Sequence, residues 1–365
     1  MGAYMMMLGG SSFFASVIAG FIGDGQGWQW VLYWCAIFNA IAFVILFFFF
    51  EETMYYRGNN VETLAAQEEV ITKGGAVTPD EEKGAPVSTI SSPSRTYRKK
   101  TYLQKLNLFT VIPEKPNELL AHIYRPLLLL RFPVIFWCGF QYGSNLMWFN
   151  VLNGTAALIL TSPPYNFSSS LVGVAYVAPL IGVLLGYFPP SIWLIFSGLW
   201  AGKAGDILCL KLARRNGGIR EPEQRLWLFL VNLFIMPAGL ILWGVGAAHG
   251  ISWGGLVIGL AMVGFCLTTG GGVPINYLVD SYKDLSGEGL ITMILIRNTM
   301  SFGFNYGITP WLTTSGVQNT LVAVGMLAFG FTATFFFFVK FGKTIRRASA
   351  RTYWRYVETG VGGTH

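Results

Sequence analysis

The chain has 365 residues, of which 53% are hydrophobic and only 12% are charged. Soluble domains carry roughly 25% charged residues, so this composition excludes a soluble protein and indicates one that resides in the lipid bilayer. The net charge of +7 would suggest nucleic acid in a soluble protein, but these cations lie between apolar runs. Their positions therefore indicate which loops face the cytoplasm, and we expect no nucleic-acid partner.

Two apolar runs open the chain, at 1–22 and 28–50. Each is long enough to cross the roughly 30 Å hydrocarbon core of a bilayer. The first run lacks the basic residues that begin a signal peptide, so we expect a spanning helix.

A polar block, 51–125, follows these two spans. Its Gly/Pro/Ser/Thr-rich centre cannot bury enough apolar surface to fold, which predicts a flexible linker. Its basic end, 97–109, alternates cations with apolar residues and suits a short helix on an anionic membrane surface. A solvated basic run explains this end equally well.

Six further spans are expected before a basic tail at 342–365. They are predicted at 126–160, 171–200, 226–248, 253–279, 289–311 and 320–341. The stretch 171–200 exceeds the roughly 20 residues that a span needs, and we favour an insertion at 187–196 over a long, kinked helix. The predicted domains are therefore two helices at 1–50, a linker at 51–125, a six-helix bundle at 126–341 and the tail.

Lys and Arg are distributed very unevenly between the predicted loops. The loops 23–27, 161–170, 249–252 and 315–319 contain neither residue. Cations are retained on the cytoplasmic side of a membrane, so both termini and the linker are expected there, in a multi-pass protein of the plasma membrane. Cysteines and histidines are too scattered to predict a metal site, and no nucleotide-binding loop occurs. We expect no enzyme activity, cofactor or metal.

Several motifs resemble the major facilitator superfamily, particularly fungal relatives of drug:proton antiporters. Gly-Lys-Ala-Gly-Asp at 202–206, followed by Leu-Ala-Arg-Arg-Asn-Gly-Gly at 212–218, resembles the signature loop between helices eight and nine of that family. Trp-Gln-Trp-Val at 28–31 resembles the start of its sixth helix. Residues 9–20 resemble the antiporter motif of helix five, but Ala15 and Ser16 stand where that motif has Gly-Pro, which counts against proton antiport.

The resemblance implies an all-α membrane protein with eight transmembrane helices: two from an incomplete N-terminal bundle and a six-helix C-terminal bundle of the major facilitator type. These would correspond to helices five to twelve of the family, with the first four absent. The resemblance also implies a gating role for the signature loop, with Asp206 stabilising one gating state. A simple cationic anchor explains the arginines but not Asp206. The expected gating residues are Gly202, Gly205, Asp206, Arg214 and Arg215.

Polar residues within the spans are candidates for a solute pathway, because such side chains are costly against lipid. Asn298, Phe302, Asn305 and Thr309 share one helical face, and so do Gln141, Asn145 and Trp148. Hydrogen bonds between helices are an equally good explanation for the amides.

Arg297 and Asn276 complete the predicted pathway. Arg297 lies roughly 13 Å along its helix from the nearest polar turn, and a charge at that depth indicates function. Pairing with Asp280 is the alternative. Asn276 closes a Gly- and Pro-rich stretch, 268–276, which suggests a broken helix at a solute site or a kink for close packing.

The function predicted is secondary, alternating-access transport of small organic solutes by a truncated transporter. Its expected partners are the lipid bilayer, an amphipathic or cationic solute and, for coupling, protons. The alternative is a non-transporting membrane remnant or an incomplete gene model.

Overall fold

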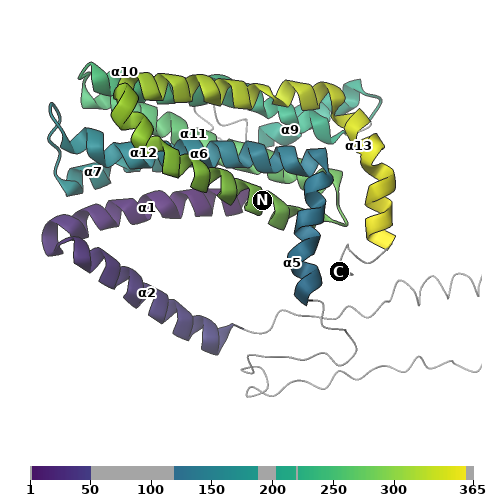
Figure 1. Cartoon of the computed structure of the whole chain (residues 1–365), viewed down its shortest axis with the longest axis horizontal. Helices are drawn as coiled ribbons and strands as arrows, with labels where there is room; N and C mark the ends of the chain where they lie inside the picture. Colours follow the sequence, from purple (N-terminus) through teal and green to yellow (C-terminus); the bar gives the residue numbers. More distant parts are fainter. Residues whose placement is uncertain (1, 51–118, 188–202, 219–220, 359–365) are drawn as a thin grey trace, which may run out of the picture. The chain divides into compact units, whose positions relative to one another are not determined.

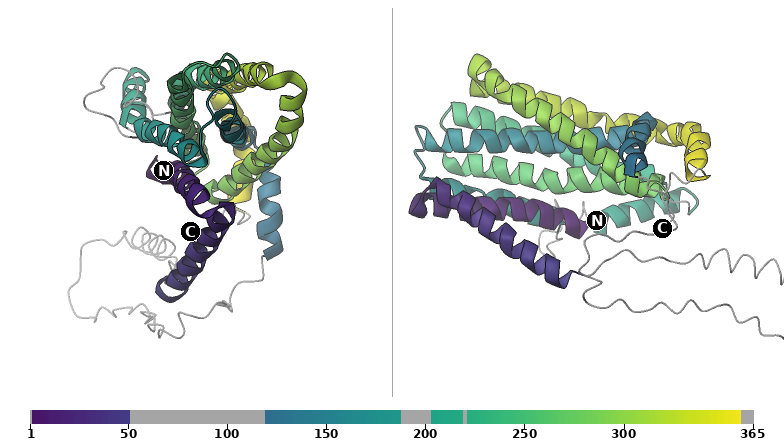
Figure 2. Two further views of the ribbon diagram at one scale, coloured as in Figure 1. Left: turned by 90° about the vertical axis from the view of Figure 1, so that its left-hand side faces the viewer. Right: turned by 60° about the horizontal axis from the view of Figure 1, so that its bottom comes forward.

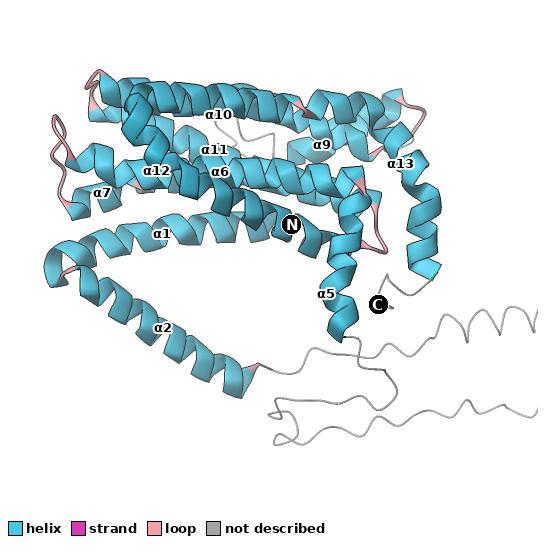
Figure 3. Ribbon diagram, in the orientation of Figure 1, coloured by secondary structure: helices cyan, strands magenta, loops and turns pink. Residues whose placement is uncertain are grey.

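A computed structural model of the chain (Figure 1) describes residues 2–50, 119–187, 203–218 and 221–358. Within these ranges the secondary structure is helical and contains no strand (Figure 3), which confirms the all-α prediction. The basic end at 97–109, most of the predicted linker and nearly all of the predicted insertion at 187–196 lie outside the described residues. The chain forms two compact units, Met1–Trp34 with Asn117–Thr364, and Cys35–Pro116.

The first two predicted spans are helices. They are α1 (Gly2–Gln26) and α2 (Trp28–Phe49). Gly27 separates them at a φ of +92°, a conformation that favours glycine. Apolar side chains surround α2, and none of its residues is buried within the chain, as expected for a helix that faces lipid.

The third predicted span begins differently from the expected 126–160. The structure has α5 (Leu119–Leu128), a short 3₁₀ turn η1 (Leu129–Arg131) and α6 (Pro133–Thr161). Phe132 is extended and interrupts the helix, and Pro133 starts α6 at the position where its missing N–H costs nothing. Helix α5 thus begins inside the stretch that the sequence assigned to the linker, and its buried Arg125 lies 3.8 Å from Glu288.

In the middle of the chain, the spans predicted at 226–248 and 253–279 correspond to helices, whereas the stretch predicted at 171–200 is described only to Tyr187 and comprises two helices. The elements of this part of the chain are α7 (Ser169–Ala175), α8 (Val177–Tyr187), α9 (Lys203–Arg215), η2 (Pro222–Leu228), α10 (Phe229–Ala248) and α11 (Trp253–Ser281). Ser168 caps α7 by accepting a hydrogen bond from the Leu171 N–H.

The last two predicted spans are joined end to end. They form α12 (Ser286–Ala333), inside which Gly316 has a φ of +76° and a ψ of 163°, and α13 (Phe335–Glu358). Gly316 lies in the cation-free turn predicted at 315–319, and the non-helical dihedrals there reverse the chain direction.

Among the residues that the structure describes, five helical stretches are long and apolar enough to cross a membrane. They are Met7–Gln26, Trp28–Phe49, Pro222–Ala248, Trp253–Ser281 and Ser286–Val357. The last contains two predicted spans, whereas α6 carries a row of amides and is not among the five. The count of eight spans therefore stays a prediction.

Helices α6, α8, α10, α11 and α12 lie side by side along one long axis (Figure 2). Helix α6 packs mainly on α12, while α11 packs on both α8 and α10. Glycines allow these close approaches, because Gly182 of α8 and Gly264 of α11 each lie directly against the backbone of the other helix. Helix α1 packs on α7 and α8, where Gly20 contacts Gly173.

Candidate functional site

One face of α12 carries an exposed stripe of polar and aromatic residues. Asn298, Phe302, Asn305 and Thr309 are all exposed, with Phe302 at 74% of its full exposure. Tyr306, which the sequence analysis did not select, is 83% exposed beside them. The structure therefore places the predicted α12 residues on one accessible surface, which we call the α12 stripe.

Arg297 is held at the edge of the α12 stripe by α6. Its Nη1 donates a hydrogen bond to the Tyr142 hydroxyl at 2.8 Å, and its guanidinium carbon lies 4.9 Å from the centre of the Tyr142 ring. Its Nε and Nη2 donate to Asn298 Oδ1 at 3.2 and 3.0 Å. The alternative partner, Asp280, lies instead 3.7 Å from Arg225.

Tyr142 can reach Arg297 because α6 and α12 cross closely at a glycine. A Cβ on Gly143 would lie 3.1 Å from the Arg297 Cα, so a larger residue there would separate the helices. The sequence analysis missed Tyr142, since nothing in the local pattern of either helix indicates which turns of the two helices meet.

The other predicted lining residues are packed inside the bundle. Gln141, Asn145 and Trp148 are 0%, 2% and 1% exposed. The Asn145 amide donates to the Gln141 carbonyl at 2.8 Å and packs against Gly270 of α11. Neither polar atom of the Gln141 side-chain amide has a hydrogen-bond partner. The structure thus separates these three residues from the exposed α12 stripe.

Helix α11 continues unbroken through the stretch where a broken helix was one prediction. Pro274 lies inside the helix and has no N–H to donate to the carbonyl of Gly270. The Thr269 hydroxyl in the same stretch donates a hydrogen bond of 2.5 Å to Asn232 of α10. Asn276 is half-buried. Gly270 allows the close approach of Asn145 from α6, whereas the role of this stretch at a solute site stays a prediction.

The predicted gating loop is described only in part. Gly202 lies outside the described residues, whereas Gly205 and Asp206 lie in α9, with side chains that the structure does not describe. Arg214 and Arg215 are exposed in the last turn of α9, where cations interact favourably with the helix dipole.

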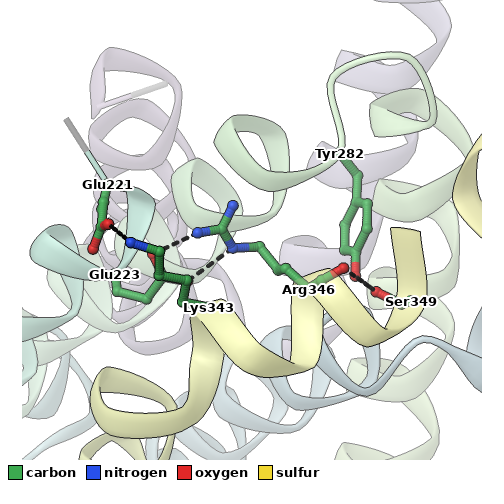
Figure 4. Close-up of polar contacts among 6 residues, drawn as sticks. All are labelled: Glu221, Glu223, Tyr282, Lys343, Arg346 and Ser349. Atoms are coloured by element: carbon green, nitrogen blue, oxygen red, sulfur yellow. Dashed lines mark hydrogen bonds and ion pairs between the residues drawn. The ribbon is translucent and has the colours of Figure 1, made fainter. Parts of the chain in front are cut away.

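A second polar cluster, absent from the sequence predictions, joins η2 to α13 (Figure 4). Arg346 donates two hydrogen bonds of 2.8 Å to the two carboxylate oxygens of Glu223, which is only 5% exposed. Lys343 pairs with Glu221, and the hydroxyls of Tyr282 and Ser349 lie 2.9 Å apart. The partners are more than 60 residues apart in the chain, and the sequence analysis had assigned the cations only to topology.

The pKa values of Glu221 and Tyr282 in this cluster are shifted. The hydrogen bond from Lys343 lowers the pKa of Glu221, so this pair stabilises the fold above the ordinary carboxyl range, and its contribution is lost as the pH falls through the lowered value. Burial raises the pKa of Tyr282, which keeps its hydroxyl protonated. No group of three metal-ligating side chains occurs in the described part of the chain.

Comparison with known proteins identifies the relatives of this chain. The sequence profile of the Major Facilitator Superfamily matches residues 1–290. An uncharacterised MFS-type transporter of Schizosaccharomyces pombe is 27% identical over 383 residues, which cover 98% of this chain and 64% of the relative. Protein HOL1 of Saccharomyces cerevisiae is 32% identical over 62% of this chain and 36% of its own length.

Quinidine resistance protein 3 of Saccharomyces cerevisiae is a more distant relative, 25% identical over 56% of this chain and 27% of its own length. The chain thus spans less than two thirds of each of these three relatives. No solved structure matches it.

Proposed function

Because the chain belongs to the major facilitator superfamily, we propose that it acts as a secondary transporter of small organic solutes by alternating access. It is an integral, multi-pass membrane protein. Residues 202–218, with Asp206 and the two arginines of α9, are the proposed gating segment.

The observation that carries this proposal is the exposed α12 stripe. Amides that face lipid leave hydrogen-bonding groups unsatisfied at a cost of several kcal/mol, so Asn298 and Asn305 are best accommodated by water or solute. Tyr142 holds the Arg297 guanidinium beside the same surface. The guanidinium in turn donates two hydrogen bonds to Asn298 and fixes its side chain.

An amphipathic solute suits this surface. Phe302 and Tyr306 offer exposed ring faces next to the two amides. A cationic group would lie over the Tyr306 ring, because Tyr306 projects from the side of α12 opposite Arg297 at 3.6 residues per turn. We include proton coupling in the proposal only as the source of energy for solute transport.

Exchange of both stripe amides, Asn298→Ala with Asn305→Ala, is expected to lower solute uptake about tenfold or more, because each lost hydrogen bond contributes about 1 kcal/mol. Uptake of a fluorescent amphipathic amine into sealed vesicles containing the purified chain, under a pH gradient, measures this effect. Asn166→Ala, which alters an exposed amide in the α6–α7 loop, is the matched control. Unsaturable uptake equal to that of protein-free vesicles would favour the non-transporting remnant.

We also propose that both termini are cytoplasmic in the plasma membrane, as the loop charges predict. In a variant without the four native cysteines, an impermeant thiol reagent should label His249→Cys on intact cells. It should label Arg351→Cys only after permeabilisation. Both positions are exposed, but His249 follows α10 in a cation-free loop, whereas Arg351 lies in the cation-rich C-terminal part of α13. Labelling of the α13 position on intact cells would reverse the orientation.

A further inference from the structure

Helix α13 lies at one end of the bundle (Figure 1), where it packs on η2. Three polar contacts hold it there. Arg346 binds Glu223, Ser349 meets Tyr282, and the Tyr353 hydroxyl lies 2.5 Å from Asp284 Oδ2. These contacts lie along successive turns of α13 and join it to η2 and to the residues that follow α11.

A pocket of about 280 Å³ lies between α13 and the end of α11. Residues that carry a cation or a hydroxyl group line it, together with Ala350. The cations are Lys343, Arg346 and Arg347, and the hydroxyl groups belong to Ser281, Tyr282 and Tyr353.

The charges around this pocket do not balance. Lys343 faces Glu221, and Arg346 faces Glu223. Arg347 is exposed and forms no ion pair with any carboxylate of the described residues. The Ser281 hydroxyl oxygen is buried without a hydrogen-bond partner. One guanidinium and one hydroxyl donor are therefore available together, a combination that suits a phosphate group.

The pocket also lies at the depth where the apolar surface ends. Phe336, Phe337 and Phe341 are 44%, 53% and 42% exposed on α13, and Lys343 follows within two residues. Ser281 is the last residue of α11. Lipid phosphates lie at this boundary between the hydrocarbon core and water, and basic pockets between helix ends at this level bind anionic headgroups.

We propose that this pocket binds the phosphate group of an anionic phospholipid headgroup. Arg347 provides the charge and Ser281 a hydrogen bond, while the ion pairs of Lys343 and Arg346 keep the walls of the pocket in place. Such a lipid would join α13 to the end of α11 on the side of the bundle that the loop charges assign to the cytoplasm.

Native mass spectrometry of the purified full chain, titrated with short-chain phosphatidic acid, tests the proposal. Arg347→Gln should weaken binding about tenfold or more, since it removes a hydrogen bond between two charged groups. Arg351→Gln removes the same charge from the next turn of α13, outside the pocket lining, and should change binding less than twofold. Ser281→Ala, which keeps every charge, should weaken binding several-fold.

Two further probes identify the source of the phosphate. Phosphatidylcholine should bind more weakly than phosphatidic acid, and inorganic phosphate should fail to displace bound lipid. Displacement by inorganic phosphate, with the same sensitivity to Arg347→Gln, would support the pocket but assign it to free phosphate. Equal effects of Arg347→Gln and Arg351→Gln, or no preference for the anionic lipid, would overturn the proposal.

Discussion

Glu223→Gln is expected to lower the unfolding free energy by about 3 kcal/mol, the low end of the range for breaking a buried ion pair. The side chain of Glu223 is 6% exposed, whereas that of Arg346 is 24% exposed. The arginine would keep its charge without a counter-charge, but part of it can still reach water. Loss of the bidentate contact would also release α13 from η2, because Arg346 makes both hydrogen bonds.

The matched control for this change is Glu221→Gln. Glu221 pairs with Lys343 in a more exposed position, with side chains 24% and 50% exposed, so the expected loss is under about 1 kcal/mol. Thermal unfolding of the purified variants in one detergent measures both effects. Adding Arg346→Met to Glu223→Gln should recover much of the loss, because the uncompensated charge is then removed. Similar losses from Glu221→Gln and Glu223→Gln would contradict the assignment of a buried pair.

Gly264→Ala is expected to cost about 3 kcal/mol and to reduce the yield of folded protein severely. A Cβ at this position would lie 2.4 Å from the carbonyl oxygen and 2.7 Å from the Cα of Pro179. These are backbone atoms of α8, so the clash can be relieved only by moving the two helices apart, a form of overpacking. Gly182→Ala should behave alike, because its Cβ would lie 2.1 Å from the Ala261 oxygen.

Gly272→Ala, on the same helix, is the control. A Cβ there meets no atom within 4 Å, and alanine stabilises a helix interior by about 0.5–1 kcal/mol relative to glycine. The melting temperature should therefore fall in Gly264→Ala and rise in Gly272→Ala, and size-exclusion profiles should show less folded protein only for Gly264→Ala. A Gly264→Ala protein as stable as Gly272→Ala would mean that α8 and α11 do not approach so closely.

Hydropathy alone located most of the helices, because the bilayer requires long apolar runs and closed backbone hydrogen bonding. The predicted run at 28–50 and α2 (Trp28–Phe49) differ by one residue. Prediction was weaker where a helix start depends on a single local residue. Phe132, which separates η1 from α6, is extended. The proline that follows it favours this conformation, but hydropathy alone joined both sides into one span.

The candidate site was predictable only as far as helical periodicity reaches. Periodicity places Gln141, Asn145 and Trp148 on one face of α6, but the packing of α11 and α12 decides that this face is buried. The same limit hid the contact between Arg297 and Tyr142, which are 155 residues apart. The proposed roles of Asn298, Asn305 and Thr309 remain predictions, although all three are accessible.

Pro274 weakens the backbone hydrogen bonding of α11 at one turn, although the helix is continuous there. Pro274 cannot donate a hydrogen bond to the carbonyl of Gly270, so bending the helix at this turn would break fewer backbone hydrogen bonds than bending it elsewhere. The buried amide of Asn145 touches Gly270 from the neighbouring helix, and that of Gln141, one turn away on α6, is still unpaired. The consequence for α11 is a turn with one backbone hydrogen bond fewer than its neighbours, beside an amide whose hydrogen-bonding capacity is unused.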